Sequence, residues 1–327
     1  MPAQRGVALL VVMLILALMM VVAASISSRF QSSLLRSRNV VNMEQAKWYA
    51  IGSEALVAKV LNQDIKDSPT RTYLSQYWAR ENQVFPIGDS TLTGGIRDAQ
   101  ACFNLNAFAT TDTTKLAYVT SVFKSLLGVV GVEDSQAEQV AASVADWVDS
   151  NDEMSSGYGA EDAWYQSLKV PYLAANQSMA DVSELRTVRG VSSKVYRKLL
   201  PYVCTIPTTE LAVNINTVKT GQAALLSALL LGKLSLQSAQ ELLAARPTDG
   251  WEDLVTFKSE SAITSAMSGL SSDEKTAFSG AIVIKSSYFE ARMKIELDDL
   301  QLAFTTLFKR QGSNKVVAIR RQFGGLE

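Results

Sequence analysis

The hydrophobic pattern of this chain begins with an uncharged run from Gly6 to Ser28. As a helix rising ~1.5 Å per residue, this run would extend about 34 Å, enough to cross a hydrocarbon core of ~30 Å. A secretory signal has a shorter apolar region followed by a small-residue cleavage site. The run therefore predicts an uncleaved membrane anchor with a transmembrane helix over residues 7–28. Arg5 favours a cytoplasmic amino terminus, which would place the rest of the chain across the membrane.

The helical pattern continues beyond the membrane run. Residues 25–60 contain no proline, and apolar positions recur at spacings of three, four and seven. These positions are Phe30, Leu34, Val41, Trp48, Ile51 and Ala55. Such a period marks one face of a helix. We expect a single helix from about Val7 to about Leu61, half in lipid and half packed on a globular domain, with Ser68-Pro69 preventing its continuation.

Alternating apolar and polar positions predict strands near both ends of the globular part. They cover residues 91–105, 289–297, 302–308 and 315–323, with turns at Asp298-Asp299 and at 311–314. The residues between them have helical periodicity. The predicted fold class is α+β, a long N-terminal helix on an antiparallel sheet with a large inserted all-α domain. The expected divisions are 29–107 for the first part of the sheet domain, 108–280 for the insertion and 281–327 for the last strands.

Several local motifs lie in the helical block. "NLNAF" at 104–108 and "NINTV" at 214–218 each precede a helical run, which indicates an internal duplication. Ser135-x-x-Glu138 is typical of a capping box at a helix start. We also expect the tryptophans to pack in the core; they include Trp48, Trp147, Trp164 and Trp251.

Composition limits the chemistry. The chain has no histidine, which removes histidine general bases and His-ligated zinc. Its net charge of −1 argues against a nucleic-acid-binding protein. An oxidising compartment would favour a disulfide between Cys102 and Cys204, the two cysteines of the chain; two buried free thiols are the alternative.

The most acidic stretch is "DWVDSNDEMSSGYGAEDAWY" at 146–165, which contains no basic residue. Carboxylates crowded on a loop repel one another unless a cation joins them, and Ca²⁺ accepts irregular oxygen sites. One interpretation is a structural calcium site built from Asp149, Asp152, Glu161 and Asp162, with Asn151 or backbone carbonyls helping. The alternatives are a solvated acidic loop and a glycosidase-like carboxylate pair.

Residues 183–203, "SELRTVRGVSSKVYRKLLPYV", have the spacing of a helix-hairpin-helix unit. Such units bind DNA phosphates through a glycine turn and nearby basic residues, here Arg189 and Lys194 among others. The same pattern also serves as a packing unit in SAM-like helical domains. A location across the membrane favours the packing interpretation.

The start of the chain resembles the type IV pilin class, whose short basic leader ends in a glycine directly before the membrane helix. The resemblance implies that a prepilin peptidase cuts between Gly6 and Val7, that residues 1–6 are the leader, and that Val7 becomes N-methylated. Further stretches, "RGVALLVVMLILALM", "GAED", "ANQSMADVSELRTVRGV" and "PYVC" before "NINT", are similar to the K-type minor pseudopilins of type II secretion systems. This family has a pilin-like core interrupted by a helical domain, a calcium site near the acidic loop, and a disulfide.

The resemblance also implies a function. Major pilins have a glutamate at mature position five, which is Val11 here, so this chain would start a filament rather than continue one. The expected protein is not an enzyme. It caps the pseudopilus tip with I-type and J-type minor pseudopilins, contacts other pseudopilins and the inner-membrane assembly platform, and binds no nucleic acid. Its globular part would lie in the periplasm of a bacterium, anchored in the inner membrane. The alternative is a membrane-anchored periplasmic carboxylate hydrolase.

Overall fold

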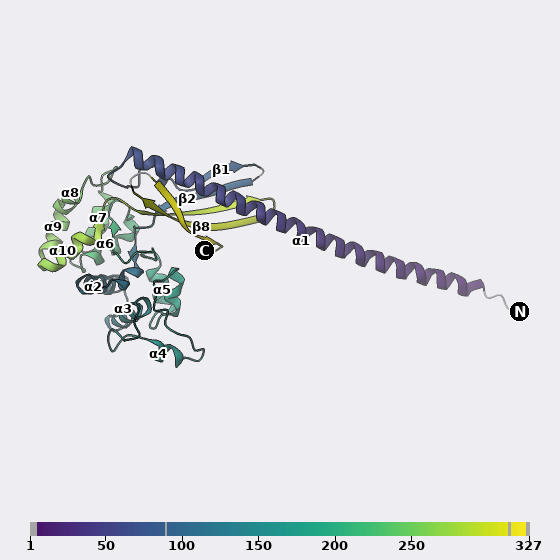
Figure 1. Ribbon diagram of the computed structural model, residues 1–327, viewed down its shortest axis with the longest axis horizontal. Coiled ribbons are helices and arrows are strands. Elements are labelled where there is room, and N and C mark those ends of the chain that lie inside the picture. The colour runs from purple at the N-terminus through teal and green to yellow at the C-terminus, as the bar shows by residue number, and fades with distance from the viewer. Residues whose placement is uncertain (1–4, 89, 313–314, 325–327) are drawn as a thin grey trace.

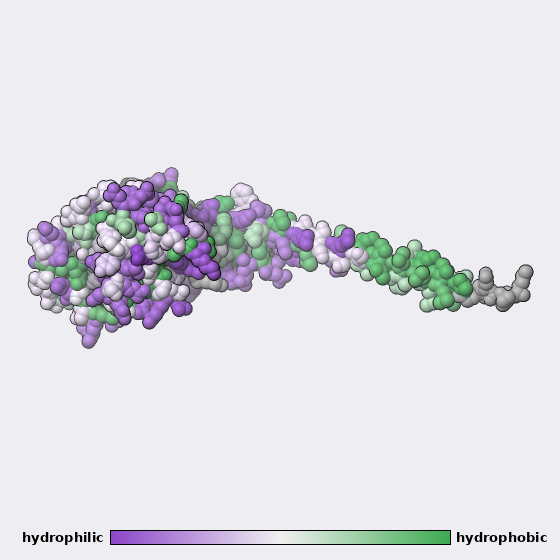
Figure 2. Space-filling view, turned by 90° about the horizontal axis from the view of Figure 1, so that it is seen from below, coloured by the Kyte–Doolittle hydropathy of each residue, from purple (hydrophilic) through white to green (hydrophobic). Residues whose placement is uncertain are grey.

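A single long helix leads into the globular part of the protein (Figure 1). The computed structural model describes residues 5–88, 90–312 and 315–324; the leader residues 1–4 lie outside them. Helix α1 (Arg5–Asp67) ends directly before Ser68-Pro69, as expected. Its outer part is covered by hydrophobic side chains and stands clear of the globular part (Figure 2). The predicted continuous helix is confirmed, and its apolar segment is long enough for one membrane crossing.

The sheet is antiparallel and has five strands in the order β1-β2-β7-β8-β9. They are β1 (Gln83–Ile87), β2 (Ser90–Asp98), β7 (Tyr288–Leu297), β8 (Leu300–Gln311) and β9 (Lys315–Phe323). The last three strands and the turn at Asp298-Asp299 follow the sequence prediction. In the predicted 311–314 turn, Ser313 and Asn314 lie outside the described residues. The sequence prediction missed β1 and ran the first strand seven residues past its observed end at Asp98.

Helix α1 packs on the sheet through a stripe that starts with small residues and ends with larger apolar ones, and not through the stripe that contains Trp48. The buried positions are Ala46, Ala50, Ser53, Glu54, Val57, Leu61 and Ile65. They face a core of strand side chains that includes Phe289, Met293 and Phe304. Small side chains let the helix approach the sheet closely enough for interior packing density.

The predicted packing of the large apolar stripe was therefore wrong. Phe30, Leu34, Val41 and Trp48 are 59–70% exposed, and Trp48 is the most exposed of the four at 70%. Helical geometry explains the error, because the stripe centred on Trp48 lies roughly opposite the one centred on Ala50 and Val57. The other tryptophans in question do contact the core: Trp147 and Trp251 are buried and Trp164 packs against it.

One buried ion pair fixes α1 to the C-terminal strands. The residue Glu54 is 6% exposed. It accepts a hydrogen bond from Thr306 Oγ1 at 2.7 Å and pairs with the guanidinium of Arg321 on β9. A buried carboxylate is tolerated where an opposite charge and hydrogen bonds satisfy it.

The helical insertion lies between β2 and β7 and has two halves. A short 3₁₀ helix, η1 (Tyr77–Ala79), precedes the sheet. The first half contains β3 (Phe103–Asn104), η2 (Leu105–Ala109), α2 (Thr113–Val129), α3 (Asp134–Val148), α4 (Asp162–Gln166), η3 (Val182–Thr187), α5 (Ser193–Leu199) and β4 (Val203–Cys204). The second contains β5 (Val213–Asn214), η4 (Thr220–Gln222), α6 (Ala223–Leu229), α7 (Leu236–Ala244), α8 (Leu254–Ser259), α9 (Ser261–Ser268), α10 (Ser272–Ala281) and β6 (Ile282–Val283). The division at 107/108 and 280/281 stays a prediction.

The two halves repeat the same architecture, which supports the predicted duplication. Each begins and ends with a two-residue strand, and the two strands of a half pair in parallel. The insertion is thus not purely helical. In the first half, the side chain of Asn106 accepts from Met179 N and donates to Met179 O. In the second, Asn216 holds Trp251 in the same way.

The predicted capping box at Ser135 and Glu138 was wrong. Helix α3 begins one residue before Ser135, after an N-cap at Glu133. The carboxylate of Glu138 pairs instead with Lys124 on α2 at 2.8 Å. A capping box does open α10, where Ser271 and Glu274 satisfy each other's backbone N–H groups. Glu138 therefore joins two consecutive helices, α2 and α3.

A buried carboxylate joins the insertion to the sheet. Asp98 at the end of β2 is 7% exposed. Its oxygens accept from Gln100 N at 2.8 Å, Asn214 Nδ2 at 3.0 Å, Thr217 Oγ1 at 2.6 Å and Ser286 Oγ at 2.5 Å. Burial raises the pKa of Asp98, and these four donors oppose the shift. Gln100 and Ser286 lie where the chain enters and leaves the insertion, and Asn214 and Thr217 lie in its second half, so Asp98 is a hub of this contact.

The expected disulfide is present between Cys102 and Cys204. The two cysteines lie beside β3 and in β4, the paired strands that close the first half of the insertion. The bond therefore closes a loop that contains nearly all of that half.

Candidate functional site

The acidic loop between α3 and α4 is shaped around Asp146. One carboxylate oxygen accepts from Ser155 N at 2.8 Å and the other from Ala160 N at 2.7 Å. A Cβ at Gly159 would collide with this carboxylate, so the loop requires glycine there. Asp146 thus holds the loop through hydrogen bonds to both of its carboxylate oxygens.

In the part of the chain that the structure describes, Glu161 has a buried carboxylate with no hydrogen-bond donor to stabilise its charge. Glu161 is only 5% exposed. Among the described residues, neither of its carboxylate oxygens has a hydrogen-bond partner. Burial raises the pKa of Glu161 to about 7, and the carboxylates of Asp146, Asp149, Asp152 and Asp162 add to the shift. A buried carboxylate beside like charges is costly unless a cation compensates it.

The neighbouring predicted ligands are partly engaged. Asp149 Oδ1 accepts from Asn151 N, Asp152 Oδ1 from Asn176 Nδ2 at 2.7 Å, and Asp162 Oδ1 from Ala174 N. Each of these contacts uses one carboxylate oxygen. Asn151 Oδ1 accepts from Glu153 N and so shapes the turn. The loop therefore gathers oxygen atoms near Glu161 without closing them into a cage.

These observations fit a hard cation, although the described residues do not form a ready-made cage. Within the described ranges, no three His, Cys, Asp or Glu side chains are grouped as a metal site. The orphaned oxygens of Glu161 and the surrounding carboxylates nevertheless supply the donor chemistry that Ca²⁺ prefers. The sequence analysis missed Asn176, whose Oδ1 is also buried without a partner. Asn176 lies 24 residues from Asp152 in the sequence and reaches it only through the tertiary fold, so no local motif could have indicated Asn176 as a candidate ligand.

The helix-hairpin-helix region is used for packing. Arg189 donates to Gly159 O at 2.8 Å and stacks on Trp164, with its guanidinium carbon 5.2 Å from the ring centroid. Lys198 donates to Gly131 O, and Gly190 O accepts from Gln136. The glycine turn and two of its basic residues thus hold the acidic loop and α3 in place, which supports the packing interpretation over DNA binding.

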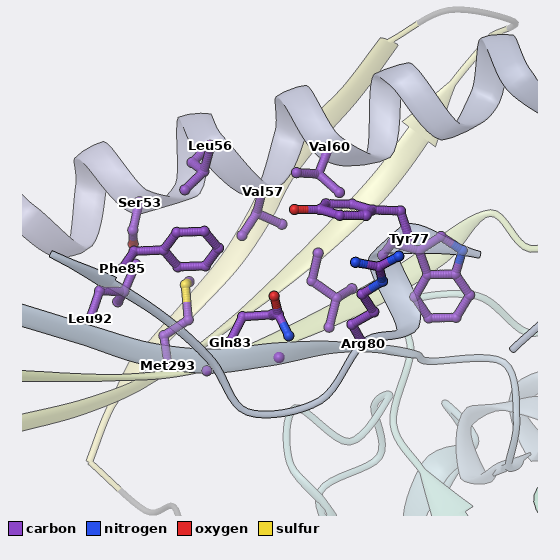
Figure 3. A pocket seen from close by; sticks show the side chains of 14 residues that line it. Ser53, Leu56, Val57, Val60, Tyr77, Arg80, Gln83, Phe85, Leu92 and Met293 are labelled. Carbon is purple, nitrogen blue, oxygen red and sulfur yellow. The ribbon is translucent and has the colours of Figure 1, made fainter. Parts of the chain in front are cut away.

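The outer face of α1 offers a second candidate surface. The stripe from Phe30 to Ala55 is exposed. An apolar hollow of about 60 Å³ also lies between α1 and the sheet (Figure 3). Leu56, Val57 and Val60 reach into it from α1, with Tyr77 and Arg80 at one end and Phe85 at the other. An uncovered apolar surface of this kind indicates a contact with another molecule.

Comparison with known proteins identifies the family. A family model described as "Type II secretion system (T2SS), protein K" matches residues 101–208, and a second with the same description matches residues 213–285. The chain belongs to the type II secretion system protein K family. The two matched ranges correspond to the two halves of the insertion.

Relatives of the protein K family match nearly the whole chain. "Type II secretion system protein K" of Aeromonas hydrophila is 45% identical over 99% of this chain and 98% of its own length. The protein of the same description from Pectobacterium carotovorum subsp. carotovorum is 38% identical over 98% and 97%. A solved chain has a TM-score of 0.81 and 32% identity, and the match covers 89% of this chain and 99% of that one. It comes from the GspK-GspI-GspJ complex of enterotoxigenic Escherichia coli. The α+β fold with its helical insertion is thereby confirmed.

Proposed function

We propose that this protein is a minor pseudopilin that caps the tip of the pseudopilus and initiates its assembly. The observation that carries the proposal is the apolar face of α1 that its own sheet leaves uncovered. Burying such a face needs partners that lie along the helix, and a related chain was solved together with GspI and GspJ. I-type and J-type minor pseudopilins are therefore the proposed partners of this face.

The start of the chain supports a position at the tip. With cleavage between Gly6 and Val7 and methylation of Val7, mature position five is Val11. A charge in the hydrocarbon core is costly unless paired. Without a carboxylate at Val11, this chain cannot neutralise the amine of a subunit ahead of it, but its own amine can be neutralised by a subunit behind it. A subunit that can only be followed belongs at the tip.

The proposed environment follows from the same arrangement. The apolar part of α1 would anchor the protein in the inner membrane by a single crossing, with the globular part in the periplasm. Other pseudopilins, the inner-membrane assembly platform and prepilin peptidase are then its further contacts. The disulfide between Cys102 and Cys204 is compatible with an oxidising periplasm.

We assign calcium to the acidic loop as a structural ion. Glu161, Asp149, Asp152 and Asp162 would hold it, with Asn151 and Asn176 as further oxygen donors. The ion would offset the repulsion among these carboxylates and fix the loop between α3 and α4. A structural role accounts for the density of carboxylates without hydrolase chemistry.

Processing provides the first test. Gly6→Leu is expected to block cleavage, because the peptidase would meet a large side chain at the proposed cut site. Intact mass of the protein purified from membranes would show the leader retained, whereas the control Ala8→Leu would be processed normally. Normal cleavage of Gly6→Leu would contradict the pilin-like processing.

Complex formation provides the second test. Trp48→Glu is expected to weaken the complex with I-type and J-type partners about tenfold, because a charge would enter the buried contact. The control Asn39→Glu adds the same charge nine residues away, two and a half turns along α1 and so on its opposite side. Affinity would be measured by fluorescence with full-length proteins in detergent. Equal losses for the two variants would argue against the stripe as the contact.

A further inference from the structure

A large cleft lies on the face of the sheet that α1 does not cover. Its volume is about 560 Å³, within the range of ligand-binding sites. Polar side chains of the sheet form one wall, among them Arg97, Glu290 and Arg292. The opposite wall comes from the insertion and is more apolar, with Tyr196, Leu200, Pro201, Val203 and Ile206.

The sheet wall contains two cations around one anion. Arg97 on β2 and Arg292 on β7 both direct Nε to the same oxygen of Glu290, at 2.8 Å and 2.7 Å. The Glu290 side chain is 14% exposed, whereas the two arginines are half exposed at 51% and 52%. Burial would raise the pKa of Glu290, but the two guanidinium groups hold it below its usual range. One carboxylate thus balances two positive charges, and the excess faces the cleft.

The other charged groups of the cleft are already engaged. Lys219 pairs with Glu81. Arg320 donates to the carbonyl oxygens of Ala180 and Thr205. The carboxylate of Asp181 accepts from Ser183 N and Gln322 Nε2, and that of Asp98 is enclosed by the hub. The cleft lining carries four positive and four negative side chains, but Lys219 and Arg320 each have a carboxylate nearby, in Glu81 and Asp181, whereas Arg97 and Arg292 share Glu290. The fourth carboxylate, Asp98, is buried, so the local excess of positive charge lies at Arg97 and Arg292.

We propose that this cleft binds an extended acidic segment of another protein, with a carboxylate seated between Arg97 and Arg292. Guanidinium groups form short, charge-assisted hydrogen bonds with carboxylates. The apolar wall at Leu200, which is 44% exposed, would take the neighbouring side chains of the segment. A free small anion would use the arginines but leave this wall and most of the volume uncovered. The proposal goes beyond tip assembly, because it uses neither the outer face of α1 nor the acidic loop.

Fluorescence polarisation with the full-length protein in detergent would test the cleft. The probe is a labelled six-residue peptide that alternates glutamate and leucine, and its counterpart replaces every glutamate by glutamine. We expect the glutamate peptide to bind at least tenfold more tightly than the glutamine one, and to weaken as salt rises. The double variant Arg97→Gln with Arg292→Gln should lose at least tenfold in affinity.

The matched control is Lys294→Gln, which removes a charge from the same face of β7 two residues beyond Arg292 but outside the cleft. It should bind the peptide as the unaltered protein does, and thermal melts would confirm that all variants fold. Equal binding of the two peptides, an unaffected double variant, displacement by acetate as effective as by the peptide, or no binding at millimolar peptide would each overturn the proposal. Trp48→Glu should leave peptide binding intact and the cleft variants should still assemble, so the two proposals fail separately.

Discussion

Replacing Glu161 with glutamine is expected to change stability in opposite directions with and without calcium. With saturating calcium the variant should lose the stabilisation that the ion provides, about 2.7 kcal/mol when its concentration is 100 times the dissociation constant. In chelator at pH 8 the variant should instead be more stable than the unaltered protein, because it removes a buried charge beside four other carboxylates. Thermal unfolding of the full-length protein in detergent measures both effects.

The direction of the stability change without calcium follows from the raised pKa of Glu161. The pKa of Glu161 is raised to about 7 in the folded protein from an ordinary value near 4.5. A raised pKa means that the contribution to stability is fully present below about pH 4.5 and is lost as pH rises through 7. Chelated protein should therefore lose on the order of 2 kcal/mol between pH 5 and pH 8, and Glu161→Gln should not show this loss.

Glu153→Gln is the matched control, since Glu153 is an exposed carboxylate on the same loop. It should respond to calcium and pH as the unaltered protein does. Unchanged calcium binding by Glu161→Gln, or lower stability of that variant in chelator at pH 8, would contradict the assignment of Glu161 as a ligand.

Asp98→Ala is expected to lower the stability of the protein by about 3–5 kcal/mol, because it leaves several buried donors without an acceptor. The melting temperature should fall by roughly 6–15 °C. Hydrogen exchange should locate the loss at the junction, with faster exchange at residues 214–218 and 286–288, while the core of α2 and α3 stays protected.

Asp112→Ala provides the comparison for that variant. Asp112 is an exposed N-cap that accepts from Thr114 N and Lys115 N at the start of α2. Losing this cap should cost only about 1 kcal/mol. If the two variants lost equal stability, or if exchange rose uniformly over the insertion, Asp98 would not be the hub of the junction.

Periodicity predicted the elements more reliably than it predicted their burial. The long helix and the three C-terminal strands are where the alternation of apolar residues places them. Strand β1 was missed in the sequence analysis because it is short, lies at an edge of the sheet and includes Pro86, which weakens the strand pattern. The capping box at Ser135 failed since the motif is short enough to occur inside a helix.

In the acidic loop too, the sequence indicated which residues take part but not which contacts they make. The carboxylates of the predicted ligand set were recognisable from their density, and the structure places Asp149, Asp152 and Asp162 close enough to shift the pKa of Glu161. Which carboxylate oxygens accept a hydrogen bond depends on the backbone N–H groups of Asn151 and Ala174 and on the side-chain amide of Asn176, and spacing along the sequence does not reveal these partners.

The sequence by itself determined the long helix with its apolar first part, the α+β order, the duplication marked by Asn104 and Asn214, and the acidic loop, because each is carried by local composition or spacing. Tertiary structure alone decided which face of α1 is buried. The stripe that contains Trp48 and the stripe that contains Ala50 and Val57 have the same helical period, and only the packing of the sheet, with Glu54 paired to Arg321, selects the second one. The cleft likewise exists only because β2, β7 and the insertion converge from distant parts of the chain.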